Sequence, residues 1–301
     1  GLEPILFLAL GLIWGSTYLA IEIVGTAVGS LTLVAFRLGI GAAILAVAVR
    51  SRREPLAPRR AWPHIAVVAI TGLVVPFSLI AWSQRDIDAG LASIFNAATP
   101  LFTLALAGIF LADEPISIRR IGGVLVGFTG VVVVVGGGIH GGGQPGAMIA
   151  MVGAAASFAV TAIWTRRFLH GIRPMTVASG QVQLGFAVVA VLAVVLERPS
   201  IAAVPVDAWA AIAWLGVVAS GVAPLLFFRL ILRWGASRTT VVNYLIPVVG
   251  VALGATVLGE RLEPSALLGG VIVAAGVALA SANPIGPLVG WSARLRPAPI
   301  G

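Results

Sequence analysis

The sequence predicts an all-α membrane protein in which ten transmembrane helices form two inverted five-helix repeats. Three observations lead to this fold class. The 301 residues are 59% hydrophobic and 10% charged, with a mean hydropathy of +1.07, so the chain has more apolar surface than a soluble domain of this length buries. The apolar residues fall into ten runs long enough to cross a ~30 Å hydrocarbon core. Landmarks of the first half recur in the second half at one constant offset.

The ten runs predict spans of roughly 18 to 25 residues each. The spans cover approximately residues 4–24, 31–50, 62–82, 89–112, 118–136, 146–166, 174–196, 207–229, 237–259 and 264–282. The first is not a cleavable signal peptide, because it lacks a basic leading region and a small-residue cleavage site. The chain is therefore expected to cross the membrane several times.

Charge predicts the orientation of the spans. All 19 cationic residues are arginines, and the net charge is +8. Because the arginines lie between apolar runs, they indicate membrane topology and no nucleic-acid partner. Fifteen of the 19 fall on the side shared by both termini, whereas Arg85, Arg198 and Arg261 fall on the opposite side. The positive-inside bias then places both termini in the cytoplasm. Cysteine is absent, which excludes a thiolate metal site, and no cofactor is expected.

The repeat is seen in a motif that is written twice. Ser93 to Pro100 and Thr240 to Pro247 share the pattern [Ser/Thr]-x-x-Asn-x-x-x-Pro at an offset of 147, and the same offset relates Trp62 to Trp209 and Gly122-Gly123 to Gly269-Gly270. Five spans per copy is an odd number, so the copies must have opposite orientations, with a ligand site expected near the midplane between them.

The repeats are assigned to residues 1–136 and 147–283, with a cytoplasmic tail at 284–301. A Gly-rich connector at 137–146 joins them and is either a flexible hinge or a passive link.

The repeated motif has a physical meaning within a membrane. Proline has no N–H group, so Pro100 leaves the carbonyl of Asn96 without its helical donor, and Pro247 does the same for Asn243. In lipid such a carbonyl must find another partner or face a wet cavity. The motif therefore predicts two kinked helices that present amides and free carbonyls to a solute. The alternative is that these small polar residues hold helices together.

Other spans carry polar and aromatic residues at helical spacing, and Pro76 and Pro224 should kink the third and eighth spans. A cavity lined by these side chains would suit a mid-sized organic solute, although a tryptophan near a span end is often an interfacial anchor. The candidate substrate-binding residues are Trp14, Tyr18, Ser78, Trp82, Asn96, Pro100, Thr161, Trp164, Asn243, Tyr244 and Pro247.

Two ionisable residues lie within spans, where a charge is costly unless it is paired or wetted. Glu22 is near the outer end of the first span and Arg37 is inside the second. They are expected either to pair with each other and lock two helices, or to take part in transport, with Glu22 as a possible carrier of a coupling proton.

Small residues predict close helix packing. Gly11-x-x-x-Gly15, Gly123-x-x-x-Gly127 and Gly250-x-x-x-Gly254 would let backbones approach closely. The fifth and tenth spans are otherwise featureless, which favours a scaffold or a dimer face. A monomer or a weak homodimer in contact with membrane lipid is expected.

These residues together resemble the EamA-type members of the drug/metabolite transporter superfamily. The resemblance is carried by Leu12 to Tyr18, by Phe36-Arg37, by the prolines of the fourth and ninth spans, and by Asp113-Glu114-Pro115 and Gly259-Glu260-Arg261. It implies ten helices in two inverted repeats and export of small metabolites across the bacterial inner membrane. Exporters of aromatic amino acids are the most similar subgroup, with carriers of sugars, nucleotide sugars or drugs as alternatives.

The predicted function is a secondary transporter that works by alternating access on a small-molecule substrate. An intramembrane enzyme is disfavoured, because the spans contain no His-Glu-x-x-His motif and no paired aspartates. A structural subunit would explain ten helices but not paired, proline-broken polar ones.

Overall fold

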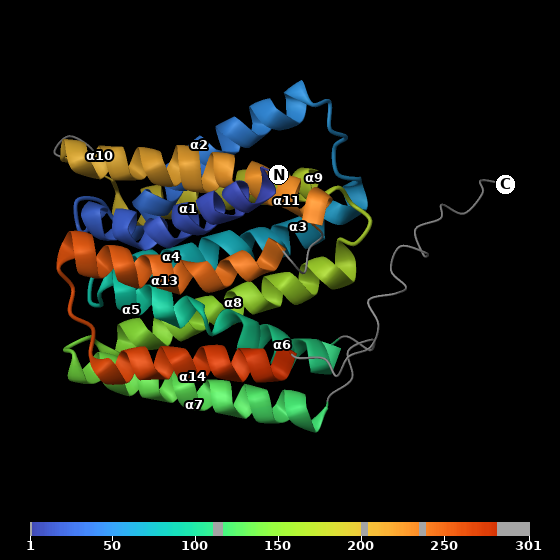
Figure 1. Cartoon of the computed structure of the whole chain (residues 1–301). Coiled ribbons are helices and arrows are strands. Elements are labelled where there is room, and N and C mark those ends of the chain that lie inside the picture. The colour runs from blue at the N-terminus through green and yellow to red at the C-terminus, as the bar shows by residue number, and fades with distance from the viewer. Residues whose placement is uncertain (1, 111–116, 200–203, 235–238, 282–301) are drawn as a thin grey trace.

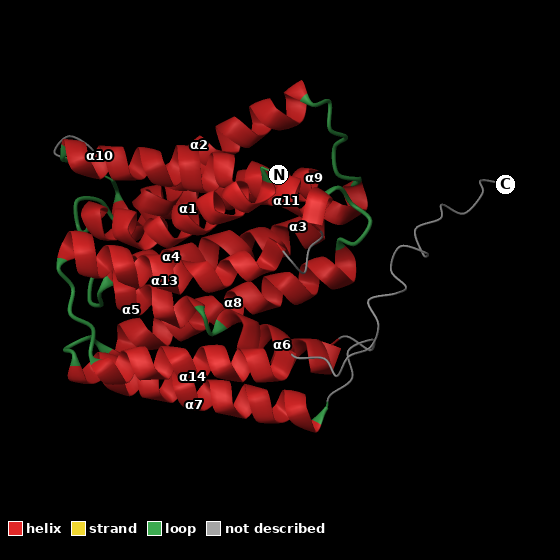
Figure 2. Cartoon of the chain, in the orientation of Figure 1, coloured by secondary structure: helices red, strands yellow, loops and turns green. Residues whose placement is uncertain are grey.

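The computed structural model describes residues 2–110, 117–199, 204–234 and 239–281, and within these ranges every regular element is a helix (Figure 2). The first repeat contains α1 (Glu3–Val24), α2 (Ser30–Ser51), α3 (Trp62–Ala69), α4 (Val75–Ser83), α5 (Ala89–Asn96), α6 (Thr99–Phe110) and α7 (Ile118–His140). The second contains α8 (Pro145–Phe168), α9 (Pro174–Leu192), α10 (Val206–Ala213), α11 (Ala223–Trp234), α13 (Leu245–Leu253) and α14 (Pro264–Ser281).

Consecutive helices join into membrane-crossing stretches. In the described ranges, nine stretches are long and apolar enough to cross a membrane by length and composition, and Pro264–Ala280 is a shorter apolar helix. The ten expected spans are therefore confirmed, with the tenth shorter than the others. The helices run between two ends of the bundle (Figure 1). We call the end where α1 begins the termini end, and the end where α1 stops at Val24 the far end.

The packing of the two repeats is reciprocal. α1 packs against α13 and against α10 and α11, whereas its counterpart α8 packs against α5 and α6 and against α4. Likewise α2 packs against α9, its own counterpart, and α7 packs against α14 (Figure 1). These main contacts of one repeat are thus matched by the equivalent contacts of the other, as two inverted copies related by a pseudo-two-fold axis require.

α7 and α14 form the most intimate helix pair, at one edge of the bundle (Figure 1). A Cβ atom added at Gly130 would lie 2.6 Å from the backbone nitrogen of Val273, and one added at Gly269 would lie 2.6 Å from that of Val134. Backbones can approach this closely only where small residues stand at the contact. The fifth and tenth spans therefore pack closely against each other, and their role as a scaffold or a dimer face stays a prediction.

The Gly-rich connector is shorter than the sequence suggests. α7 continues to His140 and α8 begins at Pro145, so only residues 141–144 form a turn. Gly137 packs against Ala266, and Gly138 packs against Met148, and this burial offsets the poor helix propensity of glycine. A flexible hinge over 137–146 is thus wrong in extent.

The prolines interrupt three spans in the expected places. π-helical segments, Ile70–Val74 and Trp214–Val222, precede Pro76 and Pro224 at equivalent positions of the two repeats. The span that contains Pro100 is broken between α5 and α6. Each proline removes one backbone donor from the helical ladder, so the chain adopts wider turns or a break beside it.

Candidate functional site

The two copies of the Asn-Pro motif lie on helices that cross in antiparallel directions. α5 packs against α13, with Gly90 against Val251 and Ser93 against Gly250. The Ser93 hydroxyl lies 2.7 Å from the Gly90 carbonyl oxygen and 3.5 Å from that of Pro247. Ser93 therefore holds the two helices together, as the alternative interpretation of the motif proposed.

The helix that carries Asn96 and Pro100 breaks at this crossing. The N–H groups of Ala97 and Ala98 donate to the carbonyls three residues earlier, and α6 begins at Thr99. Beyond the break, α6 packs against α7, α8 and α14, whereas α13 packs against α1 and α5. The fourth and ninth spans therefore contact each other in the far half of the bundle. In the termini half they pack against different helices.

The two asparagines lie beside this divergence. Asn96 is the last residue of α5, and Asn243 belongs to the 3₁₀ segment Thr240–Tyr244 that precedes α13. Both are half-buried, and neither side-chain amide forms a hydrogen bond with any described residue. Pro100 and Pro247 are half-buried as well. The two amides therefore stay candidates for binding a solute.

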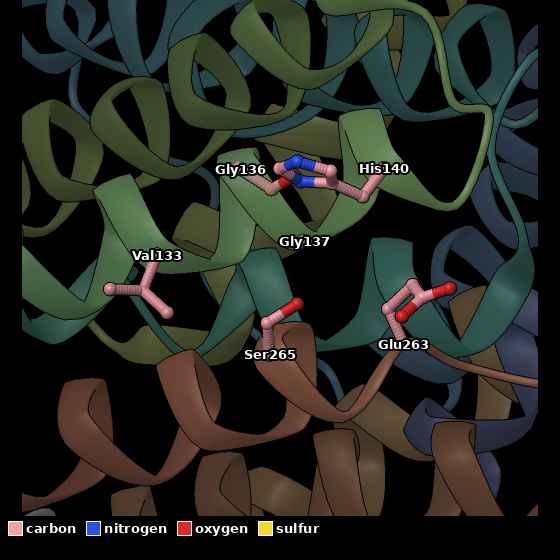
Figure 3. Close-up of a pocket in the computed structure, with 6 residues that line it drawn as sticks. All are labelled: Val133, Gly136, Gly137, His140, Glu263 and Ser265. Carbon is pink, nitrogen blue, oxygen red and sulfur yellow. The ribbon is translucent and has the colours of Figure 1, made fainter.

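Two pockets lie at the far end of the bundle, away from the midplane position that the sequence analysis expected for a cavity. A pocket of about 680 Å³ opens at the far end between α7 and the start of α14, where His140 faces Glu263 and Ser265 across a floor of glycine (Figure 3). A smaller one of about 130 Å³ adjoins it beside Asp86 and Asp88. Neither Asn96 nor Asn243 lines either of these two pockets.

Arg37 is the charged residue that the fold encloses most completely. Its side chain is 7% exposed. The Nε–H group donates to the Ser220 hydroxyl at 2.8 Å, and the guanidinium carbon lies 3.9 Å from the centre of the Phe77 ring. Tyr18 is buried nearby and interacts with Arg37 electrostatically. Helices of both repeats therefore build the surroundings of this cation.

The proposed ion pair between Glu22 and Arg37 does not form. Gln84 donates from Nε2 to the Glu22 carboxylate at 3.3 Å and to the Tyr18 carbonyl at 2.9 Å. Glu22 is thus tied to the end of α4, while Arg37 is tied to Ser220 in the second repeat. Their different partners explain why the pairing prediction is wrong.

Some of the other candidate residues lie inside the bundle. Trp14 packs against Phe227 with ring centres 5.3 Å apart. The Ser78 hydroxyl is buried without a hydrogen-bond partner among the described residues. The Thr161 hydroxyl lies 2.7 Å from that of Thr71, so it joins α8 to the third span. Trp14 and Ser78 remain candidates, whereas Thr161 fits the helix-joining alternative.

Three candidate aromatic residues are not brought to an inner site. Trp82, at the end of α4, is 44% exposed, and Tyr244 is 38% exposed on the same outer face as Val248. Trp164 packs with His64 and Phe168 near the termini end. Helical spacing alone does not distinguish the inner face of a span from the lipid-facing one, and a substrate-binding role for these three residues stays a prediction.

Two carboxylate caps at the far end were missed by the sequence analysis. Glu260 accepts hydrogen bonds from the N–H groups of Ala89 and Gly90, both at 2.8 Å. Glu197 accepts from the N–H groups of Leu31 and Thr32, at 2.9 and 2.8 Å. Both glutamates belong to the second repeat and cap helices of the first. We call these contacts the far-end caps.

The far-end caps satisfy donors that a helix cannot satisfy itself. The first N–H groups of α5 and α2 have no intrahelical acceptor, and a carboxylate there also complements the helix dipole. Burial raises the pKa of the Glu260 carboxyl, and the N–H groups of Gly90 and Ala89 oppose that rise. Asp88 and Glu22 also interact with Glu260 electrostatically. The signal for these caps in the sequence was the glutamate that both repeats carry, Glu114 and Glu260. Asp113, Glu114 and Pro115 lie outside the described residues.

No metal site is formed by the described residues, which contain no group of three or more His, Asp or Glu side chains able to hold an ion. The site therefore offers amides, hydroxyls, aromatic rings and one buried cation. Such groups bind and orient a solute, and they supply no catalytic constellation.

Comparisons with known proteins agree with this architecture. The model of the EamA-like transporter family matches residues 2–136 and 145–282. A probable terminal-alkyne amino-acid exporter of Streptantibioticus cattleyicolor is 28% identical over 280 residues, which is 91% of both chains. The uncharacterized inner membrane transporter YedA of Escherichia coli is 27% identical over 274 residues, covering 88% of this chain and 86% of that protein.

Two further matches extend the comparison. A probable amino-acid metabolite efflux pump of Salmonella typhimurium is 26% identical over 223 residues, covering 68% of this chain and 73% of that one. A crystal structure superposes with a TM-score of 0.65 at 21% identity and covers 93% of this chain and 96% of the other. This last likeness concerns the fold.

Proposed function

The chain belongs to the EamA-like transporter family, and from this premise we propose that it exports amino acids, aromatic ones in particular, by alternating access. It is a multi-pass membrane transporter of small metabolites. The names of two relatives, an amino-acid exporter and an amino-acid metabolite efflux pump, support amino acids as the solute. The aromatic preference is supported by three aromatic side chains in the bundle, Tyr18, Phe77 and Phe158. The rings of Phe77 and Phe158 are in edge-to-face contact, with their centres 6.2 Å apart.

The observation that carries alternating access is the break at Ala97 and Ala98. On the far-end side of the break, α5 packs against α13 and is capped by Glu260. On the termini-end side, α6 packs against α7 and α8. A broken helix at a repeat interface is the kind of element that rocks between two arrangements. Under this proposal, the packing of α5 against α13 and the Glu260 cap close this crossing at the far end.

The proposed orientation places the termini end in the cytoplasm. Described loops and helix ends at that end carry Arg52, Arg53, Arg59, Arg60, Arg119, Arg120, Arg166, Arg167 and Arg173. The far end carries Asp86, Asp88, Glu260 and Glu263. Positive-inside bias supports this direction, so the far-end caps would close the outer gate.

Transport by the purified chain in lipid vesicles tests the proposal. Vesicles loaded with unlabelled phenylalanine should take up labelled phenylalanine faster than vesicles without protein, and unlabelled tyrosine should support the same exchange. Alanine should exchange more slowly. Absence of exchange for a broad set of amino acids would refute the amino-acid proposal, and equal rates for alanine and phenylalanine would refute the aromatic preference.

Replacing Asn96 by Ala should lower the exchange rate about fivefold or more, because an amide that hydrogen-bonds the moving solute contributes on the order of 1 kcal/mol or more. Folding should be unaffected, because the amide has no partner among the described residues. Thr129→Ala is the matched control, since this exposed hydroxyl bonds only to the Leu125 carbonyl on its own helix. Exchange at the wild-type rate in Asn96→Ala would remove this residue from the site.

Acidification should favour the state in which Glu260 caps α5. The pKa of Glu260 is raised in the capped state, whereas in water it should return to about 4.3. The capped state therefore binds a proton more tightly, so capping is favoured as the pH falls and weakens as the pH rises through the raised pKa.

This pH dependence can be measured with a single cysteine, because the chain has none of its own. Ser93→Cys should react with an impermeant maleimide faster at pH 8 than at pH 6, after normalisation to the exposed Val206→Cys. Glu260→Gln should remove the pH dependence that remains in the normalised reaction rate of Ser93→Cys. A normalised rate that is lower at pH 8 than at pH 6 would contradict the role of Glu260 as a cap that is stabilised by acid.

A further inference from the structure

Arg37 is a buried cation that has no counter-ion among the described residues. It lies seven residues into α2, about 10 Å from the start of that helix, and is 7% exposed. Across the described ranges, no carboxylate forms an ion pair with it. Glu22, the acidic residue expected to do so, is bound by Gln84 instead.

The contacts that Arg37 makes leave most of its binding capacity unused. A guanidinium carries five N–H donors in a rigid planar fork, and only Nε has a described acceptor, the Ser220 hydroxyl. The guanidinium carbon lies 3.9 Å from the centre of the Phe77 ring, and an aromatic ring offers no oxygen or nitrogen acceptor for the remaining N–H donors. One neutral hydroxyl and one ring compensate only in part for the removal of a full charge from water.

The surroundings of Arg37 lie between the two repeats. Tyr18 comes from α1 and Phe77 from α4 in the first repeat, whereas Ser220 comes from the π-helical segment of the second. Phe158 of α8 meets the edge of the Phe77 ring. A solute held here would contact both repeats, which is the position that inverted-repeat transporters use.

We propose that Arg37 binds the carboxylate of the transported solute. The terminal N–H groups of the guanidinium match the two oxygens of a carboxylate in a bidentate pair, while Tyr18 and Phe77 contact the apolar part of the solute. One carboxylate balances the one positive charge, whereas a phosphate dianion would leave excess negative charge among apolar side chains. This inference rests on the proposed function and specifies its substrate as a carboxylic acid.

Matched pairs of acid and amide test the proposal in the purified full chain. Thermal unfolding in detergent is recorded with phenylalanine against phenylalaninamide, and with 3-phenylpropionic acid against its amide. The acids should raise the Tm of the wild type by about 3 °C at saturating concentration, and the amides should not. The acid preference should disappear in Arg37→Gln and be reduced in Arg37→Lys, which keeps the charge without the fork.

The solute-free Tm separates a binding role from a structural one. Arg37→Gln removes an unpaired buried charge, so its Tm without solute should equal or exceed that of the wild type; a structural cation would give a lower value. Ser220→Ala keeps the cation and should keep the acid preference. If Arg37→Gln does not accumulate, a structural role is indicated and the inference fails.

Two results, one in the wild type and one in Arg37→Gln, would overturn the inference. Equal stabilisation by acid and amide would show that the carboxylate is not recognised, and an acid preference that survives in Arg37→Gln would place its recognition elsewhere. Exchange of uncharged solutes by the vesicles would support the export function and would contradict this inference. Failure of all exchange, with the acid preference intact, would instead refute the transport proposal and leave Arg37 as a binding site for a carboxylate that is not transported.

Discussion

Glu260→Ala should open the far end of the bundle. The substitution removes the acceptor for the N–H groups of Ala89 and Gly90, both now 2.8 Å from the carboxylate. Loss of two charge-assisted hydrogen bonds, offset in part by water, is worth about 2 kcal/mol and shifts the equilibrium between closed and open states by about 30-fold. Ser93→Cys, buried in the wild type at the contact with Gly250, should then react with an impermeant maleimide about 30 times faster.

The same loop offers a matched control. Glu263 is exposed and its carboxylate forms no hydrogen bond with a described residue, so Glu263→Ala should leave the labelling of Ser93→Cys unchanged. Glu197→Ala removes the other far-end cap, which holds α2 and not α5, and should have a smaller effect on this cysteine. Identical labelling of Glu260→Ala and Glu263→Ala would show that helix packing, and not the carboxylate, closes the far end.

Proline chemistry made the break in the fourth span predictable. The missing N–H group of Pro100 acts on its own helix, within one turn, so a local sequence pattern was sufficient to locate it. The same reasoning applied to Pro76 and Pro224, each of which follows a π-helical segment. The inverted repeat could also be predicted from the sequence, because the offset between the copies and the odd number of spans in each copy are properties of the sequence.

The far-end caps could not be derived in this way. Glu260 is 171 residues from Ala89, and Glu197 is 166 residues from Leu31. Composition placed these glutamates on the side of the membrane opposite the termini, but it could not say which helix N-terminus each one meets. Such a contact is set by the tertiary arrangement of the two repeats.

The aromatic candidates show a second limit of sequence reasoning. Spacing of three or four residues indicates which side chains share a helix face, but in a membrane protein both the inner and the lipid-facing surfaces are apolar. The pattern therefore grouped Trp82 with Ser78 although Trp82 is 44% exposed. Polar residues were better guides, because an inward position for Arg37 follows from the cost of a charge in lipid.

Gly123→Ala should destabilise the protein strongly, although its neighbour Gly122 should tolerate the same change. A Cβ atom at Gly123 would collide with the backbone nitrogen of Ala280 and lie 2.7 Å from the Gly276 carbonyl oxygen, whereas one at Gly122 would meet nothing within 4 Å. Alanine otherwise favours a helix over glycine by about 0.5–1 kcal/mol. The clash at Gly123 must therefore overcome that gain, and forced separation of two backbones costs about 3 kcal/mol.

Thermal unfolding of the two variants, followed by tryptophan fluorescence in detergent, measures this difference. Gly122→Ala should keep or slightly raise the Tm, and Gly123→Ala should lower it by at least several degrees. Because the residues are adjacent and the substitution is the same, expression, detergent and helix propensity are matched between the variants. Equal shifts in both would mean that α7 and α14 can separate at little cost. The pair would then not be the rigid scaffold against which the broken α5 and α6 span moves.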